Sequence, residues 1–394
     1  MNIDYNDAEA INKHLIHTYN RKIVFESGEG MYLTDVNGKK YLDMGAGIAV
    51  NALGYADKDF ISDVTSQLNK LIHISNLYFS PSLIDASYLV AEATGLDKVF
   101  FTNSGTEAIE GALKMARKYK WLQNKESKGE IIAMEHSFHG RSMGALSVTG
   151  KEAYRTAFEP LIGGVKFAEY NNLDSVKALI TPDTCAIILE TLQGEGGIYP
   201  ADDEFIKGIR KLCDENDIVM ILDEIQCGMG RTGKMFTYEH YGIKPDIVTM
   251  AKAIGCGLPI GAFAASSKLM DALVPGDHGT TYGGNPLATA GVCSVFKNFK
   301  NKNILANVQK EGAYLRARLD ELKDKYDCII DVRGKGLMLG IEFNVAAGPI
   351  IEKLTDAGVL VIAAGTSIIR VVPPLIVEDK HIDSFIEALE GALA

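Results

Sequence analysis

The chain has 394 residues, which is long enough for two or three domains around a large shared core. Its formal charge of −11 argues against nucleic acid or an anionic membrane surface as a partner. No charged-then-apolar leader opens the sequence and no run of about 18 apolar residues occurs, so we expect a cytoplasmic protein. The six cysteines form no C-x-x-C pair, which favours buried free thiols over a disulfide or zinc framework.

The first fifty residues predict a polar helical segment followed by β structure. β-like runs at 23–25 and 31–35 precede a turn at 36–39, and the Asn37-Gly38 pair in that turn is typical of a hairpin. The small residues of 45–55 would let the backbone approach a ligand, or would simply form a tight turn.

The middle of the chain alternates short apolar runs with helical patterns, which predicts a mostly parallel, doubly wound α/β sheet. Beyond it, amphipathic helices alternate with strands, and we expect a smaller α+β domain there. The predicted domains are 1–50, which packs with the small domain, then a large domain at 51–288 and the small domain at 289–394. The predicted strands are 98–101, 131–134, 186–189, 218–222, 247–250, 329–332 and 368–372, and the clearest predicted helices are 108–122 and 308–325.

Two of these strands end at groups that can do chemistry. The run 218–222 stops at Asp223, and the run 246–251 leads to Lys252 among small apolar residues. Ligands of open α/β sheets bind beyond the carboxyl ends of the strands, so Asp223 and Lys252 are candidates to meet over one ligand. A lysine among apolar groups has a lowered pKa and becomes a usable nucleophile. An amine beside an acid that can keep a ring nitrogen protonated is the pairing that pyridoxal 5'-phosphate needs.

A nucleotide site is the alternative interpretation of the same stretch. The segment 228–234, GMGRTGK, has the spacing of a phosphate-binding loop, and it follows an acid at a strand end. However, Met235 stands where such a loop needs Ser or Thr for magnesium, and no clear helical period precedes Pro245. We therefore expect these glycines only to shape a turn.

Polar groups also follow the strands at 98–101 and 131–134. Ser104, Gly105 and Thr106 open a helix and could hold a phosphate, although an ordinary helix cap has the same residues. His136 and His139 are three apart, but no third ligand is evident, and we predict no metal site.

Three further candidates accompany them. Phe138 either stacks on a flat cofactor or packs in the core. Arg141 has a planar guanidinium that can bind a carboxylate through two hydrogen bonds. Glu190 and Glu195 lie on a glycine-rich loop. Acidic side chains on such a loop are usually solvated unless a cation pairs with them. Arg370 lies within an apolar strand and needs a partner or a ligand, so it could be that cation.

Together these motifs resemble the class III pyridoxal-phosphate-dependent aminotransferases of fold type I, and most closely the branch that acts on acetylornithine. The resemblance covers nearly the whole chain, and HISNLY at 73–78 is similar to the acetylornithine branch in particular. The motifs that carry it are NSGTEA at 103–108, HSFHGRS at 136–142, LQGEGG at 192–197, LDEIQCGMGRTG at 222–233, AKAIGCGLPIGA at 251–262, TTYGGNP at 280–286 and RGKGLMLGIE at 333–342.

The resemblance implies a set of cofactor contacts. Lys252 would hold the cofactor covalently and then move a proton between the substrate carbon and the cofactor, while Asp223 would pair with the pyridine nitrogen. Gln226 would reach the ring hydroxyl and Phe138 would stack on the ring. Phosphate contacts would come from Ser104, Gly105 and Thr106, and from Thr281 of a neighbouring subunit, which implies a homodimer.

The resemblance also implies the reaction. The δ-amino group of N2-acetyl-L-ornithine would pass to 2-oxoglutarate, giving N-acetyl-L-glutamate 5-semialdehyde and L-glutamate in arginine biosynthesis. Arg141 would bind the α-carboxylate of acetylornithine, and Arg370 a carboxylate of glutamate or 2-oxoglutarate. Glu195 would pair with Arg370 when the other substrate is bound, and Tyr19 is a weaker candidate for substrate contact.

Alternatives remain open at this point. One is another ω-aminotransferase, acting on ornithine, 4-aminobutyrate or succinyldiaminopimelate, and another is a non-catalytic protein that keeps the fold. The chain has Glu190-Thr191 where the family often has Glu-Pro, and Cys256 where a glycine is common. It lacks the tyrosine that ornithine aminotransferases carry near residue 47, which favours an N-acylated substrate.

Overall fold

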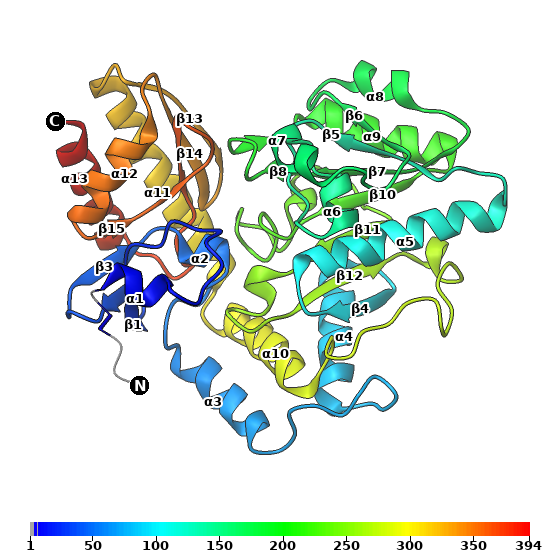
Figure 1. Cartoon of the computed structure of the whole chain (residues 1–394), viewed down its shortest axis with the longest axis horizontal. Helices are drawn as coiled ribbons and strands as arrows, with labels where there is room; N and C mark the ends of the chain where they lie inside the picture. Colours follow the sequence, from blue (N-terminus) through cyan, green and yellow to red (C-terminus); the bar gives the residue numbers. More distant parts are fainter. Residues whose placement is uncertain (1–3, 6) are drawn as a thin grey trace.

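The computed structural model describes residues 4, 5 and 7–394 and contains two lobes. The larger lobe is built on a central sheet, and the smaller lobe combines the amino-terminal strands with the carboxyl-terminal residues 304–394 (Figure 1). None of the helices in this described part is long and apolar enough to cross a membrane. The predicted domain boundaries stay a prediction.

The central sheet is mixed but mostly parallel, as predicted. Its seven strands have the order β4-β12-β11-β10-β7-β5-β6. β12 is antiparallel to both of its neighbours, β11 and β4, and the remaining pairs are parallel. The strands are β4 (Lys98–Thr102), β5 (Glu130–Met134), β6 (Val165–Ala168), β7 (Thr184–Glu190), β10 (Val219–Asp223), β11 (Ile247–Met250) and β12 (Gly261–Ala265).

Continuous apolar runs form the inner strands because both faces of the sheet are covered. In β10, Met220 and Leu222 belong to one hydrophobic cluster, whereas Val219 and Ile221 belong to the cluster on the other face. The helices of this lobe are α3 (Lys58–Leu68), α4 (Pro81–Thr94), α5 (Gly105–Gln123), α6 (Met143–Ser147), α7 (Glu152–Arg155), α8 (Leu173–Leu179), α9 (Asp203–Asn216) and α10 (Pro286–Asn301). Shorter elements are η1 (Thr156–Phe158), β8 (Leu192–Gln193), β9 (Tyr199–Pro200), η2 (Thr237–His240), η3 (Lys252–Ile254) and η4 (Ser267–Leu269).

Residues from both ends of the chain build the smaller lobe. One sheet has the order β1-β2-β3-β15, so the amino-terminal strands pair with a carboxyl-terminal one, and the other has the order β13-β14-β17-β16. The helices α11, α12 and α13 belong to the same lobe. Its elements are α1 (Ala8–Asn12), β1 (Phe25–Glu29), β2 (Tyr32–Asp35), β3 (Lys40–Asp43), α2 (Ala46–Ala49), α11 (Ile304–Lys325), β13 (Ile329–Lys335), β14 (Met338–Phe343), α12 (Ala347–Asp356), β15 (Val359–Leu360), β16 (Ile362–Ala363), β17 (Ile368–Val371) and α13 (Asp379–Leu393).

The local predictions hold at most positions. β2 and β3 form the hairpin predicted around Asn37-Gly38, and Gly38 has the positive φ of 84° that such a turn requires. The strand predicted at 23–25 is wrong for its first two residues, because β1 begins only at Phe25. The turn at 228–234 is followed by the 3₁₀ helix η2 rather than by an α-helix, in line with the interpretation of these glycines as a turn. All six cysteines are free, four of them buried and two partly buried.

Candidate functional site

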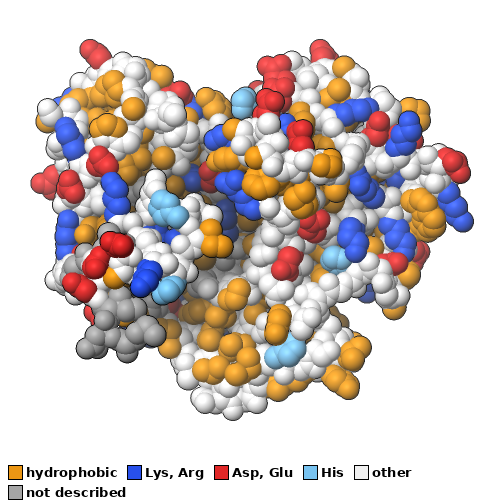
Figure 2. All heavy atoms as spheres, in the orientation of Figure 1, with side chains coloured by type: hydrophobic (Ala, Val, Ile, Leu, Met, Phe, Trp, Pro, Cys, Tyr) orange, Lys and Arg blue, Asp and Glu red, His pale blue; other side chains and the backbone are white. Residues whose placement is uncertain are grey.

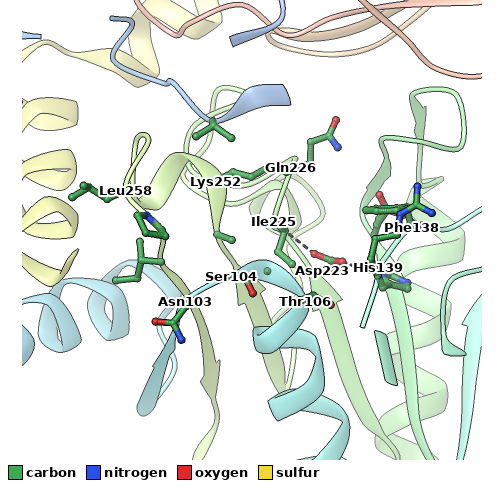
Figure 3. A pocket seen from close by; sticks show the side chains of 18 of the residues that line it. Asn103, Ser104, Thr106, Phe138, His139, Asp223, Ile225, Gln226, Lys252 and Leu258 are labelled. Carbon is green, nitrogen blue, oxygen red and sulfur yellow. Dashed lines mark hydrogen bonds and ion pairs between the residues drawn. The ribbon is translucent and has the colours of Figure 1, made fainter. Parts of the chain in front are cut away.

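The predicted residues converge at one edge of the central sheet. The strands β4, β5, β7, β10 and β11 run in the same direction, so their carboxyl ends meet at this edge. A cavity of about 490 Å³ opens there, and Figure 3 shows side chains from several strand ends around it. Of the predicted site residues, the cavity is lined by Ser104, Gly105, Thr106, Phe138, Arg141, Asp223, Gln226 and Lys252.

Lys252 follows β11 at the start of η3 and faces this cavity. Burial lowers the pKa of Lys252 to about 8 from an ordinary 10.5, the positive charge of Arg370 lowers it too, and Asp223 acts in the opposite direction. The backbone of Lys252 has a φ of 49°, which a residue with a Cβ rarely adopts. Such strain is commonly found where a side chain is held for function. The residue therefore has the amine chemistry that the sequence predicts.

Asp223 ends β10, the strand next to β11, and is held by several donors. Ile225 N–H donates to its Oδ1 at 3.0 Å, and the Thr249 hydroxyl donates to the same oxygen at 3.3 Å. The Nδ1 atom of His139 lies 2.7 Å from the other oxygen, Oδ2. Both partners of this pair are almost fully buried. The carboxylate is therefore fixed in position at the cavity wall.

His139 is the functional residue that the sequence reasoning missed. Its spacing from His136 suggests only half of a metal site, whereas the structure buries it against Asp223. Within residues 4–5 and 7–394 no group of three His, Cys, Asp or Glu side chains is arranged to hold a metal. The available signal was its place in the loop after a buried strand, at the same sheet edge as Asp223.

The amino terminus of α5 forms the lower part of the site in Figure 3. Ser104 caps this helix, since its hydroxyl accepts from Glu107 N–H at 3.4 Å. The Thr106 hydroxyl lies 2.7 Å from the Ser142 hydroxyl, which fixes its rotamer. A Cβ on Gly105 would approach the side chain of Ile225 to 2.9 Å. A helix terminus with free N–H groups and hydroxyls suits an anion such as a phosphate.

Phe138 and Glu190 are joined at the cavity. Phe138 N–H donates to Glu190 Oε1 at 3.0 Å, and Gly194 N–H donates to Glu190 Oε2 at 3.0 Å. Burial raises the pKa of Glu190 to about 7, an effect opposed by the charge of His139. Glu190 thus ties the loop that carries the aromatic ring to the glycine-rich loop, a role that the sequence did not indicate.

The two arginines lie in different surroundings. Arg370, on β17, is almost fully buried and donates to Glu195 at 2.7 Å and to the Gln226 amide oxygen at 2.9 Å. Arg141 is exposed at the cavity, with its guanidinium 3.9 Å from the ring centre of Tyr154 and 5.4 Å from that of Phe138. No acidic side chain in the described part of the chain forms a salt bridge with Arg141.

Four predicted residues do not line the cavity: Glu195 and Arg370, of which Arg370 contacts the lining residue Gln226, and also Tyr19 and Thr281. Tyr19 has 67% of its surface exposed, and the Arg21 guanidinium lies 5.1 Å from its ring centre. Thr281 lies in a separate small hollow beside 73–78. Within one chain neither residue lines the cavity, and both roles stay predictions.

The small-residue segment before the site folds in a way that its sequence did not predict. Ala46, Gly47, Ile48 and Ala49 have φ values of 48°, 62°, 64° and 61°, which makes α2 a left-handed turn. A left-handed conformation costs roughly 1–2 kcal/mol for each residue with a side chain. Val50, directly after it, lines the cavity. The turn therefore lies next to the cavity, and a close approach of its backbone to a ligand stays a prediction.

Comparisons with known proteins agree with this geometry. The family model described as "Aminotransferase class-III" matches residues 16–393. An acetylornithine aminotransferase of Clostridium acetobutylicum is 46% identical over 382 residues, covering 96% of this chain and 99% of that protein. Its counterpart in Methanocaldococcus jannaschii is 44% identical, covering 96% of this chain and 95% of that protein.

Solved structures share the fold. The N-acetylornithine aminotransferase of Stenotrophomonas maltophilia superposes with a TM-score of 0.85 at 33% identity and covers 98% of each chain. An ornithine aminotransferase of Toxoplasma gondii has a TM-score of 0.94 at 28% identity, covering 99% of this chain and 95% of that one. The description of that structure mentions pyridoxal phosphate in its active site.

Proposed function

The chain belongs to the class III aminotransferase family, whose members depend on pyridoxal phosphate, and we propose that it transfers the δ-amino group of N2-acetyl-L-ornithine to 2-oxoglutarate. The products are N-acetyl-L-glutamate 5-semialdehyde and L-glutamate, which places the enzyme in arginine biosynthesis. The cytoplasmic location expected from the sequence stays a prediction.

One observation carries the proposal: a single cavity presents an amine, a fixed carboxylate, an aromatic ring and a helix amino terminus. These are the groups that a flat, phosphorylated pyridine aldehyde needs around it. The cavity of about 490 Å³ is within the range of small-molecule sites. The residues present therefore fit the cofactor.

The residues at the reacting centre have separable roles. Bound pyridoxal phosphate supplies a carbonyl that receives the amino group and a ring that withdraws electrons from the reacting carbon. Lys252 Nζ would hold that carbonyl and would then move the proton of the substrate carbon, since its pKa of about 8 leaves a usable unprotonated fraction near neutral pH. Asp223 would pair with the ring nitrogen, and His139 keeps the Asp223 carboxylate in position.

The remaining cofactor contacts follow from the walls of the cavity. Phe138 would stack on the ring, and Gln226 would offer its amide nitrogen to the ring hydroxyl, since its oxygen already accepts from Arg370. Ser104, Gly105 and Thr106, at the amino terminus of α5, would hold the phosphate.

Two arginines are needed because one site takes two different substrates in turn. Acetylornithine reacts at its δ-carbon, far from its α-carboxylate, whereas glutamate reacts next to its α-carboxylate. Arg141, which has no acidic partner among the described residues, binds the α-carboxylate of acetylornithine. Arg370 binds a carboxylate of glutamate or 2-oxoglutarate, and Glu195 neutralises it while acetylornithine is bound. The Glu195–Arg370 ion pair would open only for glutamate or 2-oxoglutarate, and at other times it would neutralise the buried charge of Arg370.

We also propose a homodimer in which Thr281 completes the phosphate site of the other subunit. Leu77 and Phe79 are each 84% exposed and Tyr88 is 74% exposed, and apolar surface of this extent marks an interaction site. Figure 2 shows hydrophobic side chains gathered on the lower part of the molecule, over the region of α3 and α4. Asn76 donates to the carbonyls of residues 280 and 283, which holds Thr281 against this surface.

A complementation experiment tests the dimer. Lys252→Ala and Thr281→Asp each inactivate the homodimer, but a mixed dimer has one site with both native residues. Co-expression of the two variants, each with its own purification tag, is expected to give mixed dimers with about half of the wild-type activity, since one of the two sites is intact. A mixed dimer that remains inactive would show that Thr281 serves its own subunit's site.

The substrate proposal is tested by steady-state assays with 2-oxoglutarate as the acceptor. The donors are N2-acetyl-L-ornithine, L-ornithine, 4-aminobutyrate and succinyldiaminopimelate, and we expect the highest kcat/KM for acetylornithine. Lys252→Ala provides the inactive control. A preference for free ornithine, or for either of the other two donors, would refute the assignment.

A further inference from the structure

The ring of Tyr154, on α7, contacts both Arg141, the proposed substrate-binding arginine, and Lys151, which has no role in the proposed function. The Arg141 guanidinium lies 3.9 Å from the ring centre, and the Lys151 Nζ lies 4.7 Å from the same centre and 3.5 Å from the Tyr154 hydroxyl. The ring also meets Phe138 edge-on, with centroids 6.2 Å apart. One tyrosine thus joins two cations to the aromatic wall of the cavity.

Arg141 and Lys151 bring two positive charges to this ring, and neither forms a salt bridge among the described residues. The salt bridges of the described residues include none to Arg141 and none to Lys151. Two like charges beside one ring repel each other, and cation–π contacts with the ring offset only part of that cost. An anion bound close to both cations would offset the repulsion. The whole chain carries a formal charge of −11, so a local excess of positive charge at the cavity is not a general property of its surface.

We propose that Tyr154 is a positioning residue that holds Arg141 and Lys151 as a two-cation site for the α-carboxylate of the donor substrate. This inference rests on the proposed function, in which Arg141 binds that carboxylate. Arg141 supplies the direct fork at the cavity, and Lys151 raises the positive potential behind it. Figure 2 shows Lys and Arg side chains gathered beside the hollow between the lobes. The site thereby selects donors with an anionic group far from the amine that reacts.

The proposal predicts a preference that depends on charge rather than shape. N2-acetyl-L-norvaline has the acyl group and α-carboxylate of acetylornithine but no amine to transfer, and N2-acetyl-L-norvalinamide replaces the carboxylate by a neutral carboxamide of nearly the same shape. The inhibition constants of both are measured against acetylornithine with the cofactor-loaded enzyme. The ratio of the two constants reports how strongly the site favours the negative charge.

Lys151→Met is expected to lower this ratio about threefold to tenfold, the size of effect typical for one partly solvated charge. It should also raise KM for acetylornithine by a similar factor while kcat is retained. Lys151→Arg keeps the charge and should keep the ratio. Lys177→Met, which removes one positive charge from the exposed helix α8, is the matched control and should leave the ratio unchanged.

Tyr154 is tested in the same assay. Tyr154→Phe keeps the ring and should keep the ratio, whereas Tyr154→Leu removes the support of both cations and should lower it at least as much as Lys151→Met. A ratio that does not respond to Lys151→Met, or that falls equally in Tyr154→Phe and Tyr154→Leu, would overturn the proposal. If the wild-type enzyme does not turn over acetylornithine at all, the proposed function fails instead, so the two failures are distinguishable.

Discussion

Replacing Lys252 by methionine is expected to abolish transamination and yet to stabilise the cofactor-free protein near neutral pH. The side chain is enclosed by protein except where it faces the cavity, and burial lowers its pKa to about 8 from 10.5. Near neutral pH the protein must therefore hold a charged amine in surroundings that disfavour the charge. Methionine is flexible, of similar length and uncharged, and it can occupy the same space.

The size and sign of the effect follow from the two pKa values. Between pH 8 and pH 10.5 the unfolded chain binds the Lys252 proton more readily than the folded chain does, because the folded-state pKa is the lower one. The cost of the charged amine is thus fully present below pH 8 and is lost as the pH rises toward 10.5. The difference corresponds to about 3 kcal/mol at pH 7 and about 1.5 kcal/mol at pH 9.5.

The assay is denaturant unfolding of cofactor-free wild-type and Lys252→Met protein at both pH values. Lys177→Met, on the exposed surface of α8, is the control, and we expect its stability to change by less than about 0.5 kcal/mol. Lys252→Met should be the more stable protein at pH 7, by an amount that shrinks at pH 9.5. A variant that is less stable than wild type at pH 7, or a gain that is the same at both values, would refute the account of a desolvated amine.

Three other substitutions test separate parts of the structure. Arg370→Gln should slow the glutamate half-reaction about 10- to 100-fold more than the acetylornithine half-reaction, since it removes a charge-assisted contact that only one substrate makes; single-turnover kinetics would show equal losses if the switch does not operate. His139→Leu leaves the Asp223 carboxylate without its buried partner and should weaken cofactor binding about tenfold or more. The measurement is the dissociation constant for pyridoxal phosphate, and an unchanged constant would contradict the positioning role of His139. Gly111→Ala would drive a Cβ into the ring of Phe263 and should lower the free energy of unfolding by about 1–3 kcal/mol, whereas an unaltered unfolding midpoint would mean that the ring moves freely.

The strands that were predicted and those that were missed differ in composition. Buried strands such as β7 and β10 are continuous apolar runs, and they were recognised because both faces of the sheet are covered. β12, GAFAA, consists mainly of glycine and alanine, which have no strong strand preference. β6 carries a lysine between its apolar residues, and its sequence is equally compatible with a loop. Both strands depend on pairing with neighbouring strands of the central sheet, which their local sequences do not reveal.

The site also contains two kinds of residue: those whose position follows from the end of a strand, and those whose position follows from contact with a distant residue. Asp223 and Lys252 were predicted because each directly follows an apolar run, and the carboxyl ends of such strands meet at one edge. His139 was not predicted as the partner of Asp223, because 84 residues separate the two in sequence and only the fold makes them neighbours.

The sequence by itself determined which residues could do chemistry and at which ends of which strands they stand, because hydrophobic periodicity and strand boundaries are local properties. The tertiary structure alone decided other meetings: His139 with Asp223 across 84 residues, and Arg141 and Lys151 against the ring of Tyr154. It also decided the left-handed turn at Ala46–Ala49. The His139–Asp223 pair depends on a contact between segments far apart in the chain, and the strained turn persists because the surrounding fold holds it in place.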